Sequence, residues 1–324
     1  MVIVVCGEAL VDLVPRRGMG TGELSRAVPG GGPANTAVAL AGLGVDTALL
    51  CRLSGDAFGR AIRAHLTEHG VDLRLAVTAR EPSTLAVVSL DPWGSAEYGF
   101  YLRDTADWSW GPGEVPEPPE GTEAIHVGSP AAVIEPGAGH LLDRVRAHRG
   151  RAVVCFDVNA RPAVGLTREE VARHAAVWAD TAHIVKAGDE DLAWLEPDAD
   201  PLDTARAWTD RHGLDLMLLT RGAEGAVALS AHRTEEIVVP GVRVEVRDTV
   251  GAGDAFGAAV LARLGELGRL GDPAGLVDLD PERVRDVLGF AVAAAALACT
   301  TEGALAPTRE RVRGFMDLLR PVGG

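Results

Sequence analysis

The sequence predicts an α/β protein with a doubly wound, mostly parallel sheet flanked by helices. Short runs of apolar and β-branched residues alternate along the chain with segments of helical periodicity, which is the pattern of parallel strands joined by crossover helices. Several of these runs are apolar almost throughout, which is typical of strands covered on both faces of a sheet. The length of 324 residues suits one large α/β domain or two smaller ones, and we expect a single domain over 1–324.

The alternation places the elements in a definite order along the chain. Strands are predicted at 2–6, 47–53, 124–127, 152–157, 184–186, 216–220 and 226–229. Helices are predicted at 33–42, 58–69, 137–148, 168–179, 189–195, 201–212, 254–267 and 281–298.

Two segments lack this alternation. Residues 13–29 are rich in Gly and Arg, and residues 75–105 contain three strand-like runs with no helix between them. Extended segments inserted early in an α/β chain suggest a small β-lid over one edge of the main sheet. An exposed β-lid offers free strand edges, so we expect a homodimer that forms through the lid.

The charge excludes several classes of function. With 31 Lys+Arg against 46 Asp+Glu the formal net charge is −15, which argues against a nucleic-acid partner but leaves small anions possible. Lys186 is the single lysine, and Ala187 follows it, so the chain has no P-loop, which needs Lys followed by Ser or Thr.

Neither the cysteines nor the apolar segments suggest export or a membrane. The cysteines lie far apart in apolar runs, which predicts buried, reduced thiols. The longest apolar stretch, at 287–299, has 13 residues and is too short to span a bilayer. The N-terminus reads as a core strand, so we expect a cytoplasmic protein with no membrane partner.

The strongest local signal is the segment DTVGAGDAFGAA at 248–259, where a strand expected at 242–247 leads into small residues and then a helix. Small side chains let the amides of Gly251, Ala252 and Gly253 approach a ligand, and the helix dipole adds positive potential. This is an anion hole suited to a phosphoryl group. Asp254, in the first turn, would orient a substrate hydroxyl and accept its proton. The spacing alone fits equally well a capped helix in which Asp254 only complements the dipole.

A second signal is the segment GGGPANTA at 30–37. Its glycines permit close backbone approach, and Asn35 offers both a donor and an acceptor to hydroxyl groups. Asp12 is expected to close the first strand, near the edge where the carboxyl ends of parallel strands place ligands. Either feature taken alone also fits an ordinary loop and helix cap.

Together, GGGPANTA and DTVGAGDAFGAA resemble the two signatures of the ribokinase-like (PfkB) carbohydrate kinase family. GEALVD at the first strand and TRGAEGA at 220–226 extend the resemblance over nearly the whole chain, and the chain looks like a fructokinase-like member. The resemblance implies a ribokinase-like doubly wound fold with a β-lid that often forms the dimer contact. It also implies phosphorylation of a sugar hydroxyl that depends on ATP and Mg²⁺.

The resemblance assigns roles by matching position. It implies Asp254 as the catalytic base and Gly251, Ala252 and Gly253 as the anion hole. Sugar hydroxyls would be held by Asp12, Gly31, Gly32 and Asn35. The nucleotide would lie along Thr220, Gly222 and Gly225. Family members often bind a monovalent cation such as K⁺, which Asp248 and Thr249 would hold with the turn at 301–304 as a second wall.

The chain departs from the family at the segment linked to magnesium. The family has Asn-x-x-Glu there, and this chain has Gly188 in place of the Asn, followed by Asp189, Glu190 and Asp191. Glu190 and Asp191 are therefore the candidate Mg²⁺ residues.

The substrate is the least determined property. Ala106-Asp107 resembles fructokinases, whereas Tyr101-x-Arg103 resembles 2-keto-3-deoxygluconate kinases, in which an arginine can bind the substrate carboxylate. Arg161, in a segment similar to one in fructokinases, fits either substrate. We therefore expect a fructokinase that makes fructose 6-phosphate, with 2-keto-3-deoxygluconate kinase as the alternative. A nucleoside kinase, or a non-catalytic sugar or nucleotide sensor on the same fold, remains open.

Overall fold

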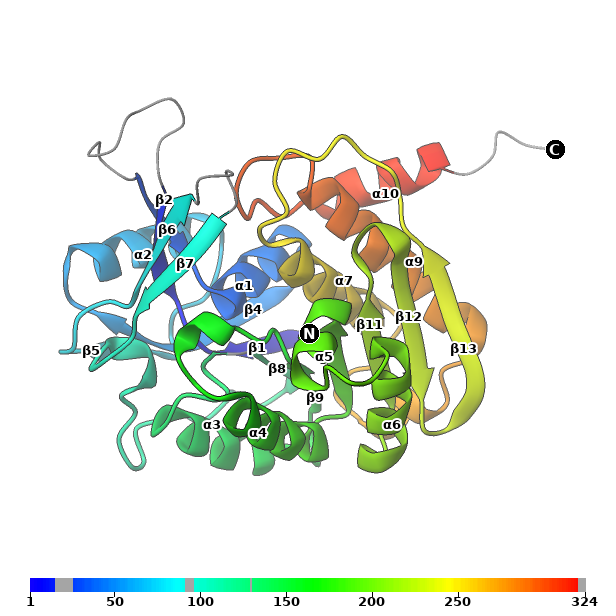
Figure 1. Ribbon diagram of the computed structural model, residues 1–324, viewed down its shortest axis with the longest axis horizontal. Helices are drawn as coiled ribbons and strands as arrows, with labels where there is room; N and C mark the ends of the chain where they lie inside the picture. The colour runs from blue at the N-terminus through cyan, green and yellow to red at the C-terminus, as the bar shows by residue number, and fades with distance from the viewer. Residues whose placement is uncertain (15–25, 91–95, 129, 320–324) are drawn as a thin grey trace.

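The computed structural model describes residues 1–14, 26–90, 96–128 and 130–319 (Figure 1). Its main sheet has nine strands in the order β13-β12-β11-β10-β9-β8-β1-β4-β5. The pairs are parallel except β11–β12 and β12–β13, which are antiparallel. The strands are β1 (Val2–Cys6), β4 (Asp46–Ser54), β5 (Ala76–Ala79), β8 (Thr122–Gly128), β9 (Val153–Asp157), β10 (Ile184–Gly188), β11 (Leu216–Thr220), β12 (Gly225–Ser230) and β13 (Arg233–Pro240). The predicted doubly wound, mostly parallel fold is confirmed.

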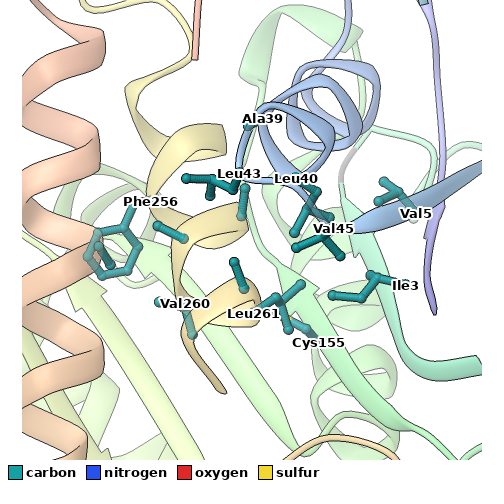
Figure 2. Close-up of a cluster of buried hydrophobic side chains, with 14 of the residues drawn as sticks. Ile3, Val5, Ala39, Leu40, Leu43, Val45, Cys155, Phe256, Val260 and Leu261 are labelled. Atoms are coloured by element: carbon teal, nitrogen blue, oxygen red, sulfur yellow. The ribbon is translucent and has the colours of Figure 1, made fainter. Parts of the chain in front are cut away.

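Helices cover both faces of this sheet (Figure 1). One face carries α1 (Gly32–Gly42), α2 (Ala57–Glu68), α7 (Ala252–Glu266), α8 (Ala274–Val277), α9 (Pro281–Ala298) and α10 (Arg309–Leu319). The other face carries α3 (Gly137–Arg146), α4 (Arg168–Thr181), α5 (Asp189–Leu195) and α6 (Pro201–His212). Because successive side chains of a strand point to opposite faces, β1 serves both cores. Ile3 and Val5 pack under α1 and α7 (Figure 2). Val4 and Cys6 pack on the opposite face, on the α3 and α4 side.

A second, four-stranded sheet, here called the small sheet, lies beside the main one. Its order is β3-β2-β6-β7. The strands are β2 (Leu10–Val14), β3 (Arg26–Gly30), β6 (Leu85–Leu90) and β7 (Ala96–Tyr101). Within the segments expected to form a lid, residues 26–29, 85–90 and 96–101 belong to the small sheet, whereas residues 15–25 and 91–95 lie outside the described residues. The described parts differ from the expectation in two ways. Ala76–Ala79 pairs with β4 in the main sheet, and the small sheet begins at Leu10. Asp12 therefore lies within β2. The expectation that it closes the first strand is wrong.

All seven predicted strands and all eight predicted helices are present, within two residues at each end. The strand predicted at 242–247 is wrong. Residues 241–248 form no ladder; Val246 is 59% exposed, and the Arg247 amide donates to the Cys299 carbonyl over 2.8 Å. The residues after β13 pair with no strand and cross instead to the start of α7.

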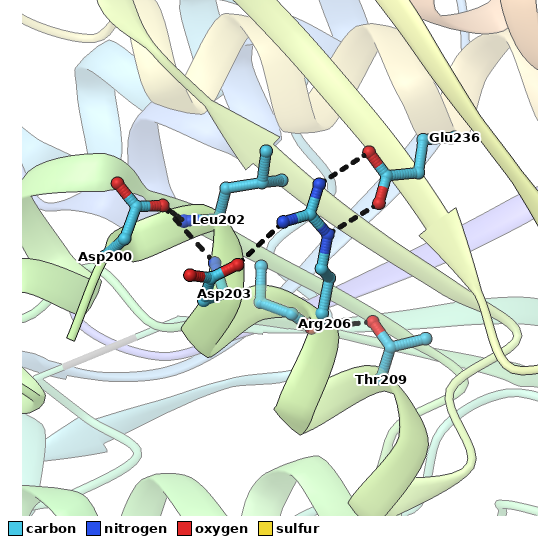
Figure 3. A network of polar contacts seen from close by, with 7 residues as sticks. Asp200, Leu202, Asp203, Arg206, Thr209 and Glu236 are labelled. Atoms are coloured by element: carbon cyan, nitrogen blue, oxygen red, sulfur yellow. Dashed lines mark hydrogen bonds and ion pairs between the residues drawn. The ribbon is translucent and has the colours of Figure 1, made fainter.

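Polar side chains secure the edge strand β13 to α6 (Figure 3). Asp200 accepts hydrogen bonds from the amides of Leu202 and Asp203 and so caps α6. Arg206 on α6 donates to both oxygens of Glu236 on β13, over 2.6 and 3.0 Å. A bidentate pair of this kind fixes orientation better than a single contact.

Cys6, Cys51 and Cys155 are free and buried, as predicted, whereas Cys299 is free but only half-buried. Burial raises the pKa of the Cys6 thiol to about 12, which keeps it protonated. Within the ranges that the structure describes, no helix has the length and apolar character needed to cross a bilayer.

Candidate active site

A cavity of about 740 Å³ opens where the main sheet meets the small sheet. Its walls come from β2, the N-termini of α1 and α7, the loop after β9, and the β10–α5 junction. These are carboxyl ends of parallel strands and starts of helices, which is the place where ligands bind in open α/β sheets. The cavity brings together residues from the two glycine-rich segments that are more than 200 positions apart in the sequence, as the Asn35–Asp254 contact shows.

The N-terminus of α7 forms one wall. Gly251 caps the helix with φ 78°, and a Cβ built on it would lie 2.7 Å from the Ala304 Cβ. Only glycine fits this backbone and this approach. Among the described residues the Gly251 and Gly253 amides have no protein acceptor, whereas the Ala252 amide donates to the Thr249 carbonyl over 3.2 Å. Two of the three expected anion-hole amides are therefore free, and the third is occupied.

Asp254 lies in the first turn of α7 and lines the cavity. Its Oδ2 accepts a hydrogen bond from Asn35 Nδ2 over 2.9 Å, which ties α7 to α1. Burial raises the pKa of Asp254 to about 6, with a further rise from Asp157, while Asn35 and Arg161 lower it. A carboxylate with this pKa is ionised at neutral pH and is a stronger proton acceptor than an ordinary Asp.

The N-terminus of α1 approaches Asp254 closely because residue 32 is a glycine. A Cβ built on Gly32 would lie 3.1 Å from Asn159 Nδ2, 3.4 Å from Asp254 Oδ1 and 3.8 Å from Glu8 Oε1. Gly31 has φ 104°, and a Cβ there would meet the Glu8 carbonyl at 2.8 Å. The glycines thus leave open a space bounded by three polar residues, Glu8, Asn159 and Asp254.

Asp12 and Arg161 line the same cavity from opposite elements, β2 and the loop after β9. Burial raises the pKa of Asp12 to about 6, and Arg161 lowers it. Arg161 is exposed on the cavity side and also lowers the pKa of Asp254. One guanidinium therefore stabilises the ionised form of two carboxylates.

Glu8, which the sequence motifs did not single out, is buried with 1% exposure and lines the cavity. Its Oε2 accepts from the Ala131 amide over 3.1 Å, and burial raises its pKa to about 8. The adjacent Ala9 amide donates to Asp107 Oδ1 over 2.9 Å, so the buried Asp107 fixes the turn that carries Glu8. At neutral pH Glu8 is mainly a neutral acid and can donate a hydrogen bond.

Lys186 is the second cavity residue that was not predicted. It lies in the middle of β10, and its Nζ donates to Asp157 over 3.0 and 2.8 Å. The apolar strand pattern around Lys186 gave no sign that its side chain ends beside the N-terminus of α7. Phe100 and Trp194 also line the cavity and were not predicted to do so.

The two candidate magnesium residues differ in what they contact. Asp191 Oδ1 and Oδ2 accept from the Ala160 and Gly188 amides over 2.8 and 2.7 Å, so this carboxylate holds the β10–α5 turn to the loop after β9. Glu190 is exposed and lines the cavity, and within the described parts of the chain its carboxylate has no hydrogen-bond or ion-pair partner. Glu190 is the freer metal donor of the two.

The candidate residues for a monovalent cation lie beside the α7 N-terminus. Thr249 lines the cavity. Asp248 accepts from the Val250 amide over 3.1 Å and from the Gly303 amide over 2.9 Å. The turn at 301–304 therefore packs against Asp248.

Seven of the expected site residues do not line the cavity: Ala252 and Asp248, which lie beside the N-terminus of α7, and five residues described next. Thr220 ends β11 beside Gly188, and Gly222 and Gly225 follow it, but none of the three lines the cavity. Tyr101 is 66% exposed and Arg103 is also exposed, so the structure does not bring them to the cavity. Phe100 lines it instead, because neighbouring residues of β7 point to opposite faces.

We expect Arg161→Met to shift the pH dependence of turnover. Below the pKa of Asp254, about 6, kcat/KM should fall about tenfold per pH unit as this carboxylate becomes protonated. Because Arg161 lowers the pKa of both Asp254 and Asp12, its removal should move this acid limb to higher pH. Arg173→Met, on the exposed face of α4, is the control and should leave the limb in place. An unchanged limb in Arg161→Met would show that the guanidinium does not act on these carboxylates.

A doubly wound sheet, a small second sheet and a carboxylate beside free amides at a helix N-terminus together define a ribokinase-like phosphotransferase. The chain belongs to the pfkB family of carbohydrate kinases, which matches residues 2–311. The fructokinase of Rhizobium leguminosarum bv. trifolii is 37% identical over 268 residues, which cover 81% of this chain and 79% of that protein.

Solved structures agree with this membership. A fructokinase from Xylella fastidiosa with bound ATP matches with a TM-score of 0.87 and 28% identity, over 99% of both chains. A double mutant of the fructokinase from Vibrio cholerae O395, with fructose, ADP and a potassium ion bound, matches with a TM-score of 0.81 and 27% identity, over 97% of both chains. The chain is thus a carbohydrate kinase.

Proposed function

We propose that this protein is a fructokinase, which transfers the γ-phosphoryl group of ATP to fructose and releases ADP and fructose 6-phosphate. The observation that carries the proposal is that Asp254 lies in one cavity together with the free amides of α7 and the polar residues of α1 and β2. The likeness to fructokinases in sequence and structure supports fructose as the sugar.

Asp254 acts as the base in this reaction. Its carboxylate accepts the proton of the sugar hydroxyl, the hydroxyl oxygen forms a bond to the γ-phosphorus, and the bond from that phosphorus to the β–γ bridging oxygen breaks. The bridging oxygen leaves as part of ADP, so the proton rests on Asp254 until it passes to solvent. The Gly251 and Gly253 amides and the α7 dipole stabilise the negative charge of the transferred group. Asn35 keeps the Asp254 carboxylate oriented through its 2.9 Å hydrogen bond.

The sugar lies between α1, β2 and the loop after β9. Asp12 and Asn35 bind hydroxyl groups, and Gly31 and Gly32 let the ring approach the backbone. Arg161 closes this side of the cavity and donates to a sugar oxygen. Glu8, as a neutral acid, is able to donate to a hydroxyl near Gly32.

The nucleotide lies toward β11 and β12, along Thr220, Gly222 and Gly225. Mg²⁺ usually keeps several waters and binds through one or two carboxylates together with substrate phosphates. The described residues include no cluster of three or more His, Cys, Asp or Glu able to hold a metal. The free carboxylate of Glu190 fits such a phosphate-borne ion, with Asp191 fixing the turn. When bound, Mg²⁺ neutralises phosphate charge.

Loops 248–251 and 301–304 are in contact beside the α7 N-terminus, and we place a K⁺ site there, with Asp248 and Thr249. The potassium ion bound to the Vibrio cholerae fructokinase supports this placement. A cation at this position would add positive potential to the anion hole.

The small sheet acts as a lid and as a dimer contact in this proposal. It forms one wall of the cavity through Asp12 and Phe100, so its movement would open and close the site. Tyr101, at 66% exposure, gives it an exposed aromatic residue suited to a partner subunit. Closure would exclude water, which competes with the sugar for the phosphoryl group.

A sugar panel tests the proposed function. ADP release should be fastest with fructose, by at least tenfold in kcat/KM over 2-keto-3-deoxygluconate, ribose and a nucleoside. Faster release with 2-keto-3-deoxygluconate would instead assign Arg161 to a carboxylate. Binding of a sugar with no ADP release above the rate without sugar would contradict the kinase assignment.

A further inference from the structure

Lys186 is a buried cation in the wall of the cavity. It is the only lysine in the chain, and it is 6% exposed. Its side chain runs from β10 to the N-terminus of α7, where a Cβ built on Gly253 would lie 2.9 Å from Nζ. The ammonium group is therefore next to one of the two free anion-hole amides.

Asp157 accepts from no more than two of the three N–H groups of Lys186. Nζ donates to Asp157 Oδ1 over 3.0 Å and to Oδ2 over 2.8 Å. A lysine ammonium has three N–H groups, and within the part of the chain that the structure describes Asp157 is the only hydrogen-bond acceptor of Nζ, so the third N–H has no protein acceptor. A buried ammonium donor is costly to leave unpaired, so the third N–H calls for an acceptor in the cavity.

The surrounding charges keep Lys186 protonated. Burial lowers its pKa, but Asp157, Asp191 and Asp254 raise it more, and the net change is upward. The three carboxylates would repel an incoming phosphate unless the ammonium group lay between them and the phosphate. Lys186 Nζ lies beside Gly253, which is where the phosphate is expected to bind.

We propose that the third N–H of Lys186 donates to an oxygen of the γ-phosphoryl group during transfer. The inference rests on the proposed function, which places that group at Gly251 and Gly253. The lysine transfers no proton: it donates a hydrogen bond while the bond to the sugar oxygen forms and the bond to ADP breaks. Lys186 thereby supplies from a strand the cation that P-loop enzymes supply from a glycine-rich loop.

The single lysine permits a direct measurement. Protein labelled with ¹⁵Nζ-lysine should give one ammonium resonance in an NMR spectrum of the full chain. Adding Mg²⁺ with the analogue AMP-PNP should shift this resonance, and adding Mg²⁺ with ADP should shift it much less. Equal shifts with both nucleotides would overturn the proposal. No change in any protein signal with either nucleotide would instead count against the proposed function.

Two variants separate catalysis from folding. Lys186→Met leaves Asp157 buried without a partner, so it is paired with the double variant Lys186→Met/Asp157→Asn, in which neither charge remains. Loss of one preorganised donor to transition-state charge costs about 10²–10³-fold in kcat. We expect that loss in the double variant, with a restored unfolding temperature and a weakened preference for AMP-PNP over ADP. A double variant that regains kcat within threefold of wild type would show that the ion pair is structural only.

Discussion

Replacing Asp254 by Asn is expected to lower kcat with fructose by about 10³-fold or more, because general-base catalysis contributes about 10²–10⁴-fold and Asn cannot accept the proton. ADP binding should persist, since Asn keeps the size of the side chain. Asp254→Ala should also be inactive. Near-normal turnover in either variant would contradict the mechanism.

The same substitution should stabilise the fold at neutral pH. Burial raises the pKa of Asp254 from 3.8 to about 6, so the native state binds this proton more tightly than the unfolded chain does. The ionised carboxylate therefore costs stability as the pH rises from about 4 to 6 and above, by up to about 3 kcal/mol. Asp254→Asn should raise the unfolding temperature at pH 7.5 and have less effect at pH 4. Glu282→Gln, in the exposed first turn of α9, is a matched control and should change neither activity nor stability appreciably.

Gly253→Ala is expected to lower kcat/KM by about 10²–10³-fold, the loss typical of one disabled oxyanion-hole donor. The added Cβ would lie 2.9 Å from Lys186 Nζ, which Asp157 and burial prevent from moving freely. It would also enter the cavity beside the free amide. Steady-state kinetics with fructose and ATP would measure the loss.

Gly257→Ala is the control for this substitution, one turn further along α7. The Cβ built there has its nearest neighbour, His126 Cε1, at 3.9 Å, which is ordinary van der Waals contact. Activity should be retained, and the unfolding temperature should rise, because Ala is better than Gly in a helix interior by about 0.5–1 kcal/mol. Equal losses in the two variants would mean that Gly253 matters for helix packing and not for the anion hole.

Much of the fold could be predicted from the sequence because local pattern and burial agree in the main sheet. Runs such as Val153–Asp157 are apolar because helices cover both faces, and the pattern shows this without any knowledge of neighbours. Pairing is not visible in the same way. Ala76–Ala79 reads as a strand, yet nothing in its residues indicates that it joins β4 instead of the small sheet. The alternation at 242–247 likewise does not reveal that this segment pairs with no strand.

In the candidate site, too, local features could be predicted and contacts between distant residues could not. Asp254, Asn35 and the glycines of α1 and α7 were predicted because helix N-termini and glycine spacing are local signals. Glu8 and Lys186 were not, because their importance comes from burial and from side chains far away in sequence. The sequence around the lone lysine excludes a P-loop but does not indicate that this residue lies in the cavity wall.

The measurement that tests the central claim most directly is ³¹P NMR of the wild type and Asp254→Asn with ATP, Mg²⁺ and fructose. The wild type should produce ADP and fructose 6-phosphate in equal amounts. Asp254→Asn should bind ADP and form sugar phosphate at least about 10³-fold more slowly. Formation of inorganic phosphate in place of a sugar phosphate by the wild type, or comparable sugar phosphate from both proteins, would contradict the account.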